Sequence, residues 1–166
     1  MRVLGIDPGS ETLGWGVVEG SGMKYSLVDF GTIKSDPKQA FSRRLANIYA
    51  GLQELTAKFT PDVLAVEEAF FAANVKVALK LGQVRGVVLL AGEQSGLEIS
   101  EFAPRLIKQT VVGYGNAEKQ QVQEMVRILL KMKAIPKPHD AADALAIAIC
   151  HFHHAGVRGR IGKTIN

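Results

Sequence analysis

The sequence predicts an α/β protein, with one domain built on a five-stranded mixed sheet flanked by helices. The first 33 residues contain three short apolar segments separated by small and polar residues, a pattern typical of an antiparallel meander. From residue 36 onwards, helical periodicity alternates with two further short apolar segments. A strand that follows a crossover helix usually joins the same sheet in parallel, which makes the expected sheet mixed.

The meander is expected to consist of strands at residues 3–7, 14–19 and 25–33. Gly20, Ser21 and Gly22 separate the second strand from the third and favour a hairpin turn. Segments 63–67 ("VLAVE") and 97–102 complete the sheet. Because a helix precedes the strand at 63–67, we expect that strand beside the first one and parallel to it.

The helices have recognisable ends. Asp36 is a good N-cap for the first helix, and Pro37 fits the first helical position. Asn74 begins a long helix that is apolar on more than one side, which fits either a buried central helix or a dimer seam. Asn116 is the expected cap of a later helix, and His151, His153 and His154 look like a frayed helix end. The remaining helices are expected at residues 104–112 and from 139 to about 154.

The chain divides into an expected domain at residues 1–156 and a basic, glycine-rich, flexible tail at residues 157–166. The single cysteine, Cys150, lies in an apolar helical pattern, which predicts a buried thiol and a reducing compartment. The sequence has no signal peptide pattern and no apolar stretch long enough to span a bilayer. We therefore expect a cytoplasmic protein with no membrane partner.

Charge is distributed unevenly along the chain. Residues 1–100 carry 10 Lys and Arg against 11 Asp and Glu, whereas residues 101–166 carry 10 against 5. A basic half indicates a polyanionic partner, with nucleic acid the first choice, or else a solvated surface that maintains solubility. Charge alone leaves both interpretations open.

Four carboxylates are placed where they could meet. Asp7 ends the first strand, and Glu67 ends the strand expected to lie beside it, so both belong to the sheet edge where α/β sites form. Asp140 and Asp143 ("HDAAD") lie three residues apart on one helical face, and the opposite face is apolar and must pack on the sheet.

Each of these acids also has a structural interpretation. Asp7 before Pro8 and Gly9 can form a turn, Asp140 can complement a helix dipole, and Glu67 can be an ordinary strand end. Together, however, clustered carboxylates raise one another's pKa values unless a cation neutralises them. Oxygen ligands without a Cys or His framework suit Mg²⁺ or Mn²⁺, and two such ions about 4 Å apart can cleave a phosphodiester.

Several long blocks, "GIDPGS", "VEEAFFAANVKVALKLGQVRG", "KQTVVGYGNAEKQQVQ" and "DAADALAIA", resemble the RuvC family of bacterial Holliday-junction resolvases. The resemblance runs from residue 1 to about residue 154. It implies a ribonuclease-H-like fold and a homodimer that makes paired, Mg²⁺-dependent nicks in four-way junction DNA during recombination and repair. It also implies one or two ions per subunit, with Mn²⁺ as a substitute, and cooperation with the RuvA and RuvB branch-migration proteins.

The resemblance assigns roles to individual residues. Glu67 is preferred to Glu68 because the family's acid lies three residues before a phenylalanine, here Phe70. His139 is interpreted as a neighbour of the site, because it lies about 100° around the helix from the first acid of the pair. The implied catalytic and metal-binding residues are Asp7, Glu67, Asp140 and Asp143. The implied DNA contacts are Lys108, Lys119 and the base wedge Phe70, with Phe71 as the second candidate for the wedge.

Lys119 has support independent of the family, because a cation in the first turn of a helix opposes the helix dipole. Three alternatives remain. An actin-like ATPase or sugar kinase begins in a similar way but needs two copies of such a fold. A YqgF-type nuclease acting on RNA shares the fold but lacks the "DAADALAIA" block. A junction-binding scaffold without catalysis would not need four acids.

Overall fold

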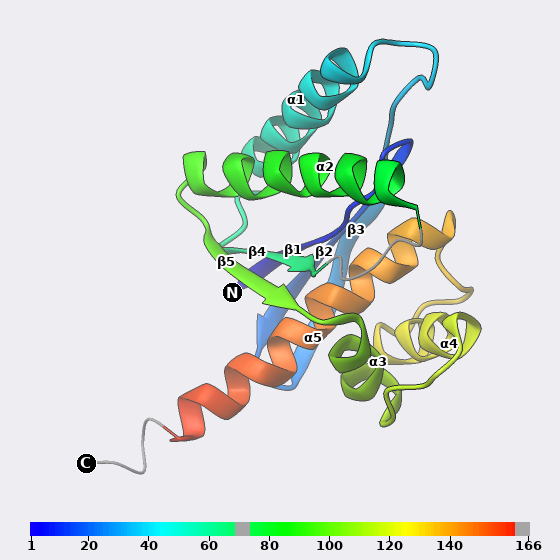
Figure 1. Cartoon of the computed structure of the whole chain (residues 1–166). Coiled ribbons are helices and arrows are strands. Elements are labelled where there is room, and N and C mark those ends of the chain that lie inside the picture. Colours follow the sequence, from blue (N-terminus) through cyan, green and yellow to red (C-terminus); the bar gives the residue numbers. More distant parts are fainter. Residues whose placement is uncertain (69–73, 162–166) are drawn as a thin grey trace.

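The computed structural model describes residues 1–68 and 74–161, with only the backbone from residue 156 onwards. Its centre is a five-stranded sheet in the order β3-β2-β1-β4-β5 (Figure 1). Strand β1 pairs antiparallel with β2 and parallel with β4, so the predicted mixed sheet is confirmed. The strands are β1 (Arg2–Asp7), β2 (Thr12–Ser21), β3 (Lys24–Lys34), β4 (Val63–Glu67) and β5 (Glu98–Phe102).

Helices cover both faces of the sheet (Figure 1). Alternating side chains of β1 explain the two layers, because Leu4 and Ile6 join one buried cluster and Val3 joins the other. The Leu4 cluster is completed by α1 (Phe41–Phe59) and α2 (Val75–Gln94). The Val3 cluster is completed by α3 (Pro104–Val112), α4 (Lys119–Leu129) and α5 (His139–Ile161). Within the described residues, no helix is both long enough and apolar enough to cross a membrane.

Two predicted starts of elements are wrong for a local reason. The Asp36 carboxylate accepts a hydrogen bond from the backbone N–H of Lys38 at 2.9 Å, which makes a turn rather than a cap, and α1 begins only at Phe41. Helix α4 is capped by Glu118 in a capping box with Gln121, not by Asn116. Both errors arise because the same residue types serve turns and caps.

The predicted hairpin turn is also shorter than expected. Gly20 pairs with Tyr25 and Ser21 pairs with Lys24, so both belong to β2. The turn consists of residues 22–23, with Gly22 at a φ of 57°. Glycine adopts this left-handed conformation without the steric cost that other residues have.

The end of α5 differs most from the prediction. The helix does not fray near residue 154 but continues to Ile161. His153 lies 3.1 Å from the Tyr25 hydroxyl, and His154 lies 3.0 Å from the Thr110 hydroxyl. His151 is buried, so these histidines are packing residues. The separate tail at 157–166 stays a prediction, since residues 162–166 lie outside the described residues. Cys150 is buried, as predicted, and burial raises the pKa of its thiol to about 11.

Candidate active site

The strand register brings Asp7 and Glu67 to one edge of the sheet. The parallel pairing of β1 with β4 runs from Val3 opposite Val63 to Ile6 opposite Val66. Asp7 and Glu67 follow this last pair, so both carboxylates emerge at the carboxyl ends of adjacent strands. The predicted meeting of these two acids is confirmed, and both line the same cavity.

Two glycines allow α5 to lie directly on the backbone of the sheet. A Cβ atom on Gly14, the residue opposite Asp7 in β2, would lie 2.0 Å from the carbonyl oxygen of Asp140. A Cβ atom on Gly5 in β1 would lie 2.1 Å from the carbonyl oxygen of Ala144. Side chains at either position would lift the amino end of α5 away from Asp7. The sequence analysis missed these residues, although a glycine inside an apolar strand indicates a close backbone approach.

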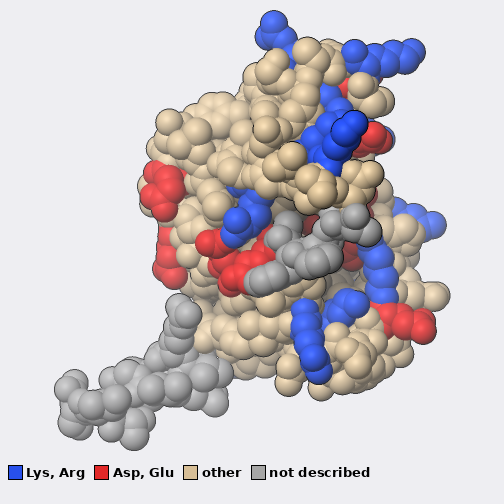
Figure 2. Space-filling view, in the orientation of Figure 1, with Lys and Arg blue, Asp and Glu red and all other residues tan. Residues whose placement is uncertain are grey.

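The cavity has a volume of about 230 Å³ and combines acidic, basic and apolar side chains. Figure 2 shows acidic side chains gathered over β5, below α2, with Lys and Arg side chains above and below them. The charged residues that line the cavity are Asp7, Glu67, Asp143, Lys108 and Lys119. Asp140 does not line it but acts on Asp7 electrostatically. His139 is exposed at the first position of α5, and Phe70 and Phe71 lie outside the described residues.

Burial, with the neighbouring charges, raises the pKa values of Asp7 and Glu67. Burial is the largest cause that raises the pKa of Asp7 from 3.8 to about 8, and the charges of Glu67, Asp143 and Asp140 add to it. Burial and the charge of Asp143 likewise raise the pKa of Glu67. The positive charge of Lys119 lowers the pKa of both groups, so nearby positive charge stabilises the charged form of the acids.

Lys119 provides part of this positive charge. It is the first residue of α4, and its Nζ atom lies 2.6 Å from Oδ2 of Asp143. This hydrogen bond is the main cause that raises the pKa of Lys119. Because a cation at a helix N-terminus opposes the dipole, the acidic cavity and not the helix favours lysine here. Its predicted place in the first helical turn is confirmed.

The donor set fits a hard divalent cation. The acidic residues that line the cavity offer carboxylate oxygens, and such ligands suit Mg²⁺, Mn²⁺ or Ca²⁺. In the described part of the chain, no three His, Cys, Asp or Glu side chains form a ready-made metal site. Asp143 is engaged by Lys119 instead, so ligation requires the carboxylates to turn towards the ion.

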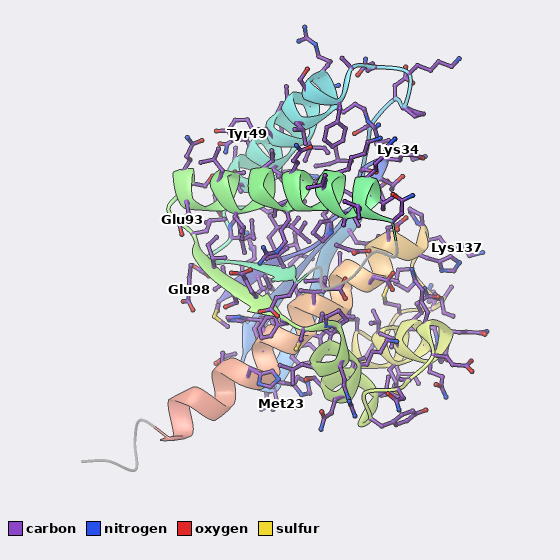
Figure 3. The ribbon with its side chains drawn as sticks, viewed as in Figure 1. Met23, Lys34, Tyr49, Glu93, Glu98 and Lys137 are labelled. Atoms are coloured by element: carbon purple, nitrogen blue, oxygen red, sulfur yellow. The ribbon has the colours of Figure 1, made fainter. Side chains whose placement is uncertain are left out.

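Positive charge on the surface is also asymmetric. In Figure 3, Lys34 and Lys137 lie on the side of the molecule opposite to Glu93 and Glu98. Lys137 lies two residues before the start of α5, the end of the helix that carries Asp140. Lys137 therefore contributes positive charge near the end of α5 that carries Asp140, where it can attract a polyanion.

A mixed sheet in this strand order, with acids at the ends of adjacent strands, defines a protein of the ribonuclease-H-like class. The sequence model for the crossover junction endodeoxyribonuclease RuvC matches residues 3–151. The chain therefore belongs to the RuvC family. Nucleases of this family depend on divalent metal ions.

Individual relatives match over nearly their whole length. The RuvC endonuclease of Caldanaerobacter subterraneus subsp. tengcongensis is 48% identical over 98% of each chain. That of Chloroflexus aggregans is 50% identical over 98% of this chain and 99% of the relative. Among solved structures, T. thermophilus RuvC in complex with a Holliday junction substrate superposes with a TM-score of 0.90. It is 38% identical, and the match covers 95% of this chain and 96% of that one.

Proposed function

We propose that this chain resolves Holliday junctions by paired, Mg²⁺-dependent nicks in four-way junction DNA. The observation that carries the proposal is the cavity in which Asp7, Glu67 and Asp143 meet Lys108 and Lys119. Acids and lysines in one cavity suit the cleavage of a phosphodiester with bound divalent cations, because acids bind cations and lysines bind phosphate. The Thermus relative described above is complexed with such a junction, which supports the choice of substrate.

In this proposal, Asp7, Glu67, Asp140 and Asp143 hold one or two Mg²⁺ ions, for which Mn²⁺ can substitute. When bound, such ions supply an activated water and neutralise charge on the phosphate. Asp7 is protonated at neutral pH in the metal-free protein, since its pKa is about 8, so it releases a proton when it becomes a ligand.

Lys108 and Lys119 are assigned to the DNA phosphate. Both line the cavity, and both act on the charge of Glu67. An ammonium group fixed beside the scissile phosphate stabilises negative charge that develops there during cleavage. When cations occupy the acids, Lys119 would give up its ion pair with Asp143 and bind the DNA phosphate instead. Phe70 remains the predicted base wedge.

Paired nicks require two active sites, and α2 offers a surface for a second copy of the chain. Val75, Leu79 and Leu90 are 74%, 63% and 52% exposed on this helix. Gly82 and Gly86 lie between them at helical spacing, and a Cβ atom on either would meet no neighbour within 4 Å. The alternative of a buried central helix is wrong for the isolated chain, because this face is exposed. A self-complementary α2 seam would give a two-fold dimer that matches the near two-fold junction.

The test is cleavage of a synthetic four-way junction by the purified protein, with Mg²⁺ or with Ca²⁺ in its place. We expect symmetric nicks with ligatable 5′-phosphate ends in Mg²⁺ only. Asp7→Asn should bind the junction without cutting it. A linear duplex of the same sequence and a structured RNA serve as control substrates.

Other results would redirect the assignment. Junction binding without cleavage in any divalent metal would indicate a scaffold, and preferential cleavage of RNA would indicate a YqgF-type nuclease. Cooperation with RuvA and RuvB stays a prediction from the family resemblance, and a cytoplasmic location stays a prediction from the sequence pattern.

A further inference from the structure

Arg44 of α1 is a buried cation that has no role in the site described so far. Its residue surface is only 5% exposed. Within the described residues, no carboxylate lies within ion-pairing distance of it, and its Nε donor has no hydrogen-bond partner. Burial of a cation without a counter-charge costs free energy, so this position requires a physical account.

The guanidinium group contacts the turn that follows Asp7. Its Nη2 atom donates a hydrogen bond to the carbonyl oxygen of Ser10. The same turn is held on its far side, where the backbone N–H of Ser35 donates to the carbonyl oxygen of Glu11 at 2.9 Å. At Gly9, a Cβ atom would lie 2.0 Å from the carbonyl oxygen of Thr12, so the backbone is tightly folded there.

Arg44 connects this turn to α1, and the Phe41 ring that it contacts also lies against α2. Its Cζ atom lies 5.4 Å from the centroid of the Phe41 ring, at the start of α1. Nζ of Lys80 in α2 lies 5.7 Å from the centroid of the same ring. A planar guanidinium held by a ring and a carbonyl oxygen has little rotational freedom. Arg44 therefore fixes the turn relative to α1.

The position of the turn determines where the Asp7 carboxylate points, because residues 8–11 carry the chain away from the end of β1. Ligand groups must be held within about 0.5 Å and 10–20° of the productive geometry. We propose that Arg44 is a positioning residue that acts through the Ser10 carbonyl group to orient Asp7 for a divalent cation. The proposal rests on the proposed function only in that it takes Asp7 to be a metal ligand.

The test is Mn²⁺ binding to the DNA-free protein, followed by the electron paramagnetic resonance signal of free Mn²⁺. Arg44→Met keeps an unbranched side chain and removes the guanidinium, and Arg44→Lys keeps the charge and one donor. Leu52→Ala is the matched control, since Leu52 is fully buried about two turns further along α1 and carries no charge or hydrogen-bond donor on its side chain. Circular dichroism confirms that each variant is folded at the temperature used.

We expect Arg44→Met to weaken Mn²⁺ binding about 10- to 100-fold, the usual effect of losing a group that orients a ligand. Arg44→Lys should lose only a few-fold. Leu52→Ala should melt at a lower temperature and bind Mn²⁺ normally. Unchanged Mn²⁺ affinity in folded Arg44→Met, or an equal loss in Leu52→Ala, would overturn the proposal. If Arg44→Met does not fold, unchanged affinity in Arg44→Lys overturns it.

A fourth variant separates this inference from the proposed function. Asp7→Asn should abolish or strongly weaken Mn²⁺ binding. If Asp7→Asn binds Mn²⁺ as the wild type does, the role of Asp7 as a ligand fails. If Asp7→Asn loses binding and Arg44→Met does not, only the role of Arg44 fails.

Discussion

Replacement of Asp7 by Asn should make the metal-free protein more stable at alkaline pH while it removes cleavage. In the folded protein, burial and three neighbouring carboxylates raise the pKa of Asp7 from 3.8 to about 8. In the unfolded chain the group has its ordinary pKa. The folded state therefore binds this proton more tightly. The contribution of this bound proton to the free energy of unfolding is complete below pH 4 and is lost as the pH rises to about 8.

The size of the effect follows from the width of this pH window. Each pH unit in which only the folded state keeps the proton changes the free energy of unfolding by about 1.4 kcal/mol. Between pH 5 and pH 8 the wild type should lose up to about 4 kcal/mol through Asp7, and about 2 kcal/mol where salt screens the neighbouring charges. Asn has no titratable proton, so the variant lacks this loss.

The assay is urea unfolding of both proteins in EDTA at pH 5 and pH 8.5. The stability advantage of Asp7→Asn should be larger at pH 8.5 by about 2–4 kcal/mol. Asp29→Asn is the control, because the Asp29 carboxylate lies 3.3 Å from Nζ of Lys58, outside the cavity. Mg²⁺ in excess over EDTA should restore the free energy of unfolding of the wild type at pH 8.5 and leave that of Asp7→Asn unchanged. The reason is that only the wild type gains free energy from binding the ion. A stability difference that is equal at both pH values would refute the reasoning.

Three further substitutions test other parts of the site. Lys119→Met should tighten Mn²⁺ binding to the DNA-free protein up to about fivefold, because an exposed ion pair is worth at most about 1 kcal/mol. The same substitution should slow junction cleavage at least about 100-fold, because the cation beside the phosphate is lost. Calorimetry and single-turnover cleavage measure the two effects, and weaker Mn²⁺ binding would contradict the role of Lys119 as a competing cation. Gly14→Ala should destabilise the protein by about 1–3 kcal/mol through its clash with Asp140, and an unchanged melting temperature would argue against this close approach. Leu79→Asp should give a folded monomer by light scattering, whereas a wild type that is already monomeric at micromolar concentration would exclude the α2 seam.

The sequence alone predicts those parts of the site that depend on strand pairing. Asp7 and Glu67 could be placed together because a crossover helix puts the following strand beside the first one. The approach of Asp140 was less predictable, since it depends on Gly14, and a glycine in a strand does not identify what comes close to it. Arg44 could not be predicted at all, because "SRRL" reads as an exposed polar segment and only the packing of α1 against the turn buries the second arginine.

The acidic site is assembled by packing and not by attraction among its side chains. Burial and, to a smaller extent, neighbouring carboxylates disfavour the charged forms of Asp7 and Glu67 and raise their pKa values. Their approach is instead imposed by the fully buried apolar face of α5, which includes Ala144 and Leu145, resting on the sheet. Burial of that face stabilises the fold enough to hold the acids together, and Lys119 offsets part of their repulsion. A bound cation would then neutralise carboxylates whose charged forms are disfavoured by burial and by one another. It follows that substitutions that loosen α5 on the sheet should lower the pKa of Asp7 and weaken metal binding together.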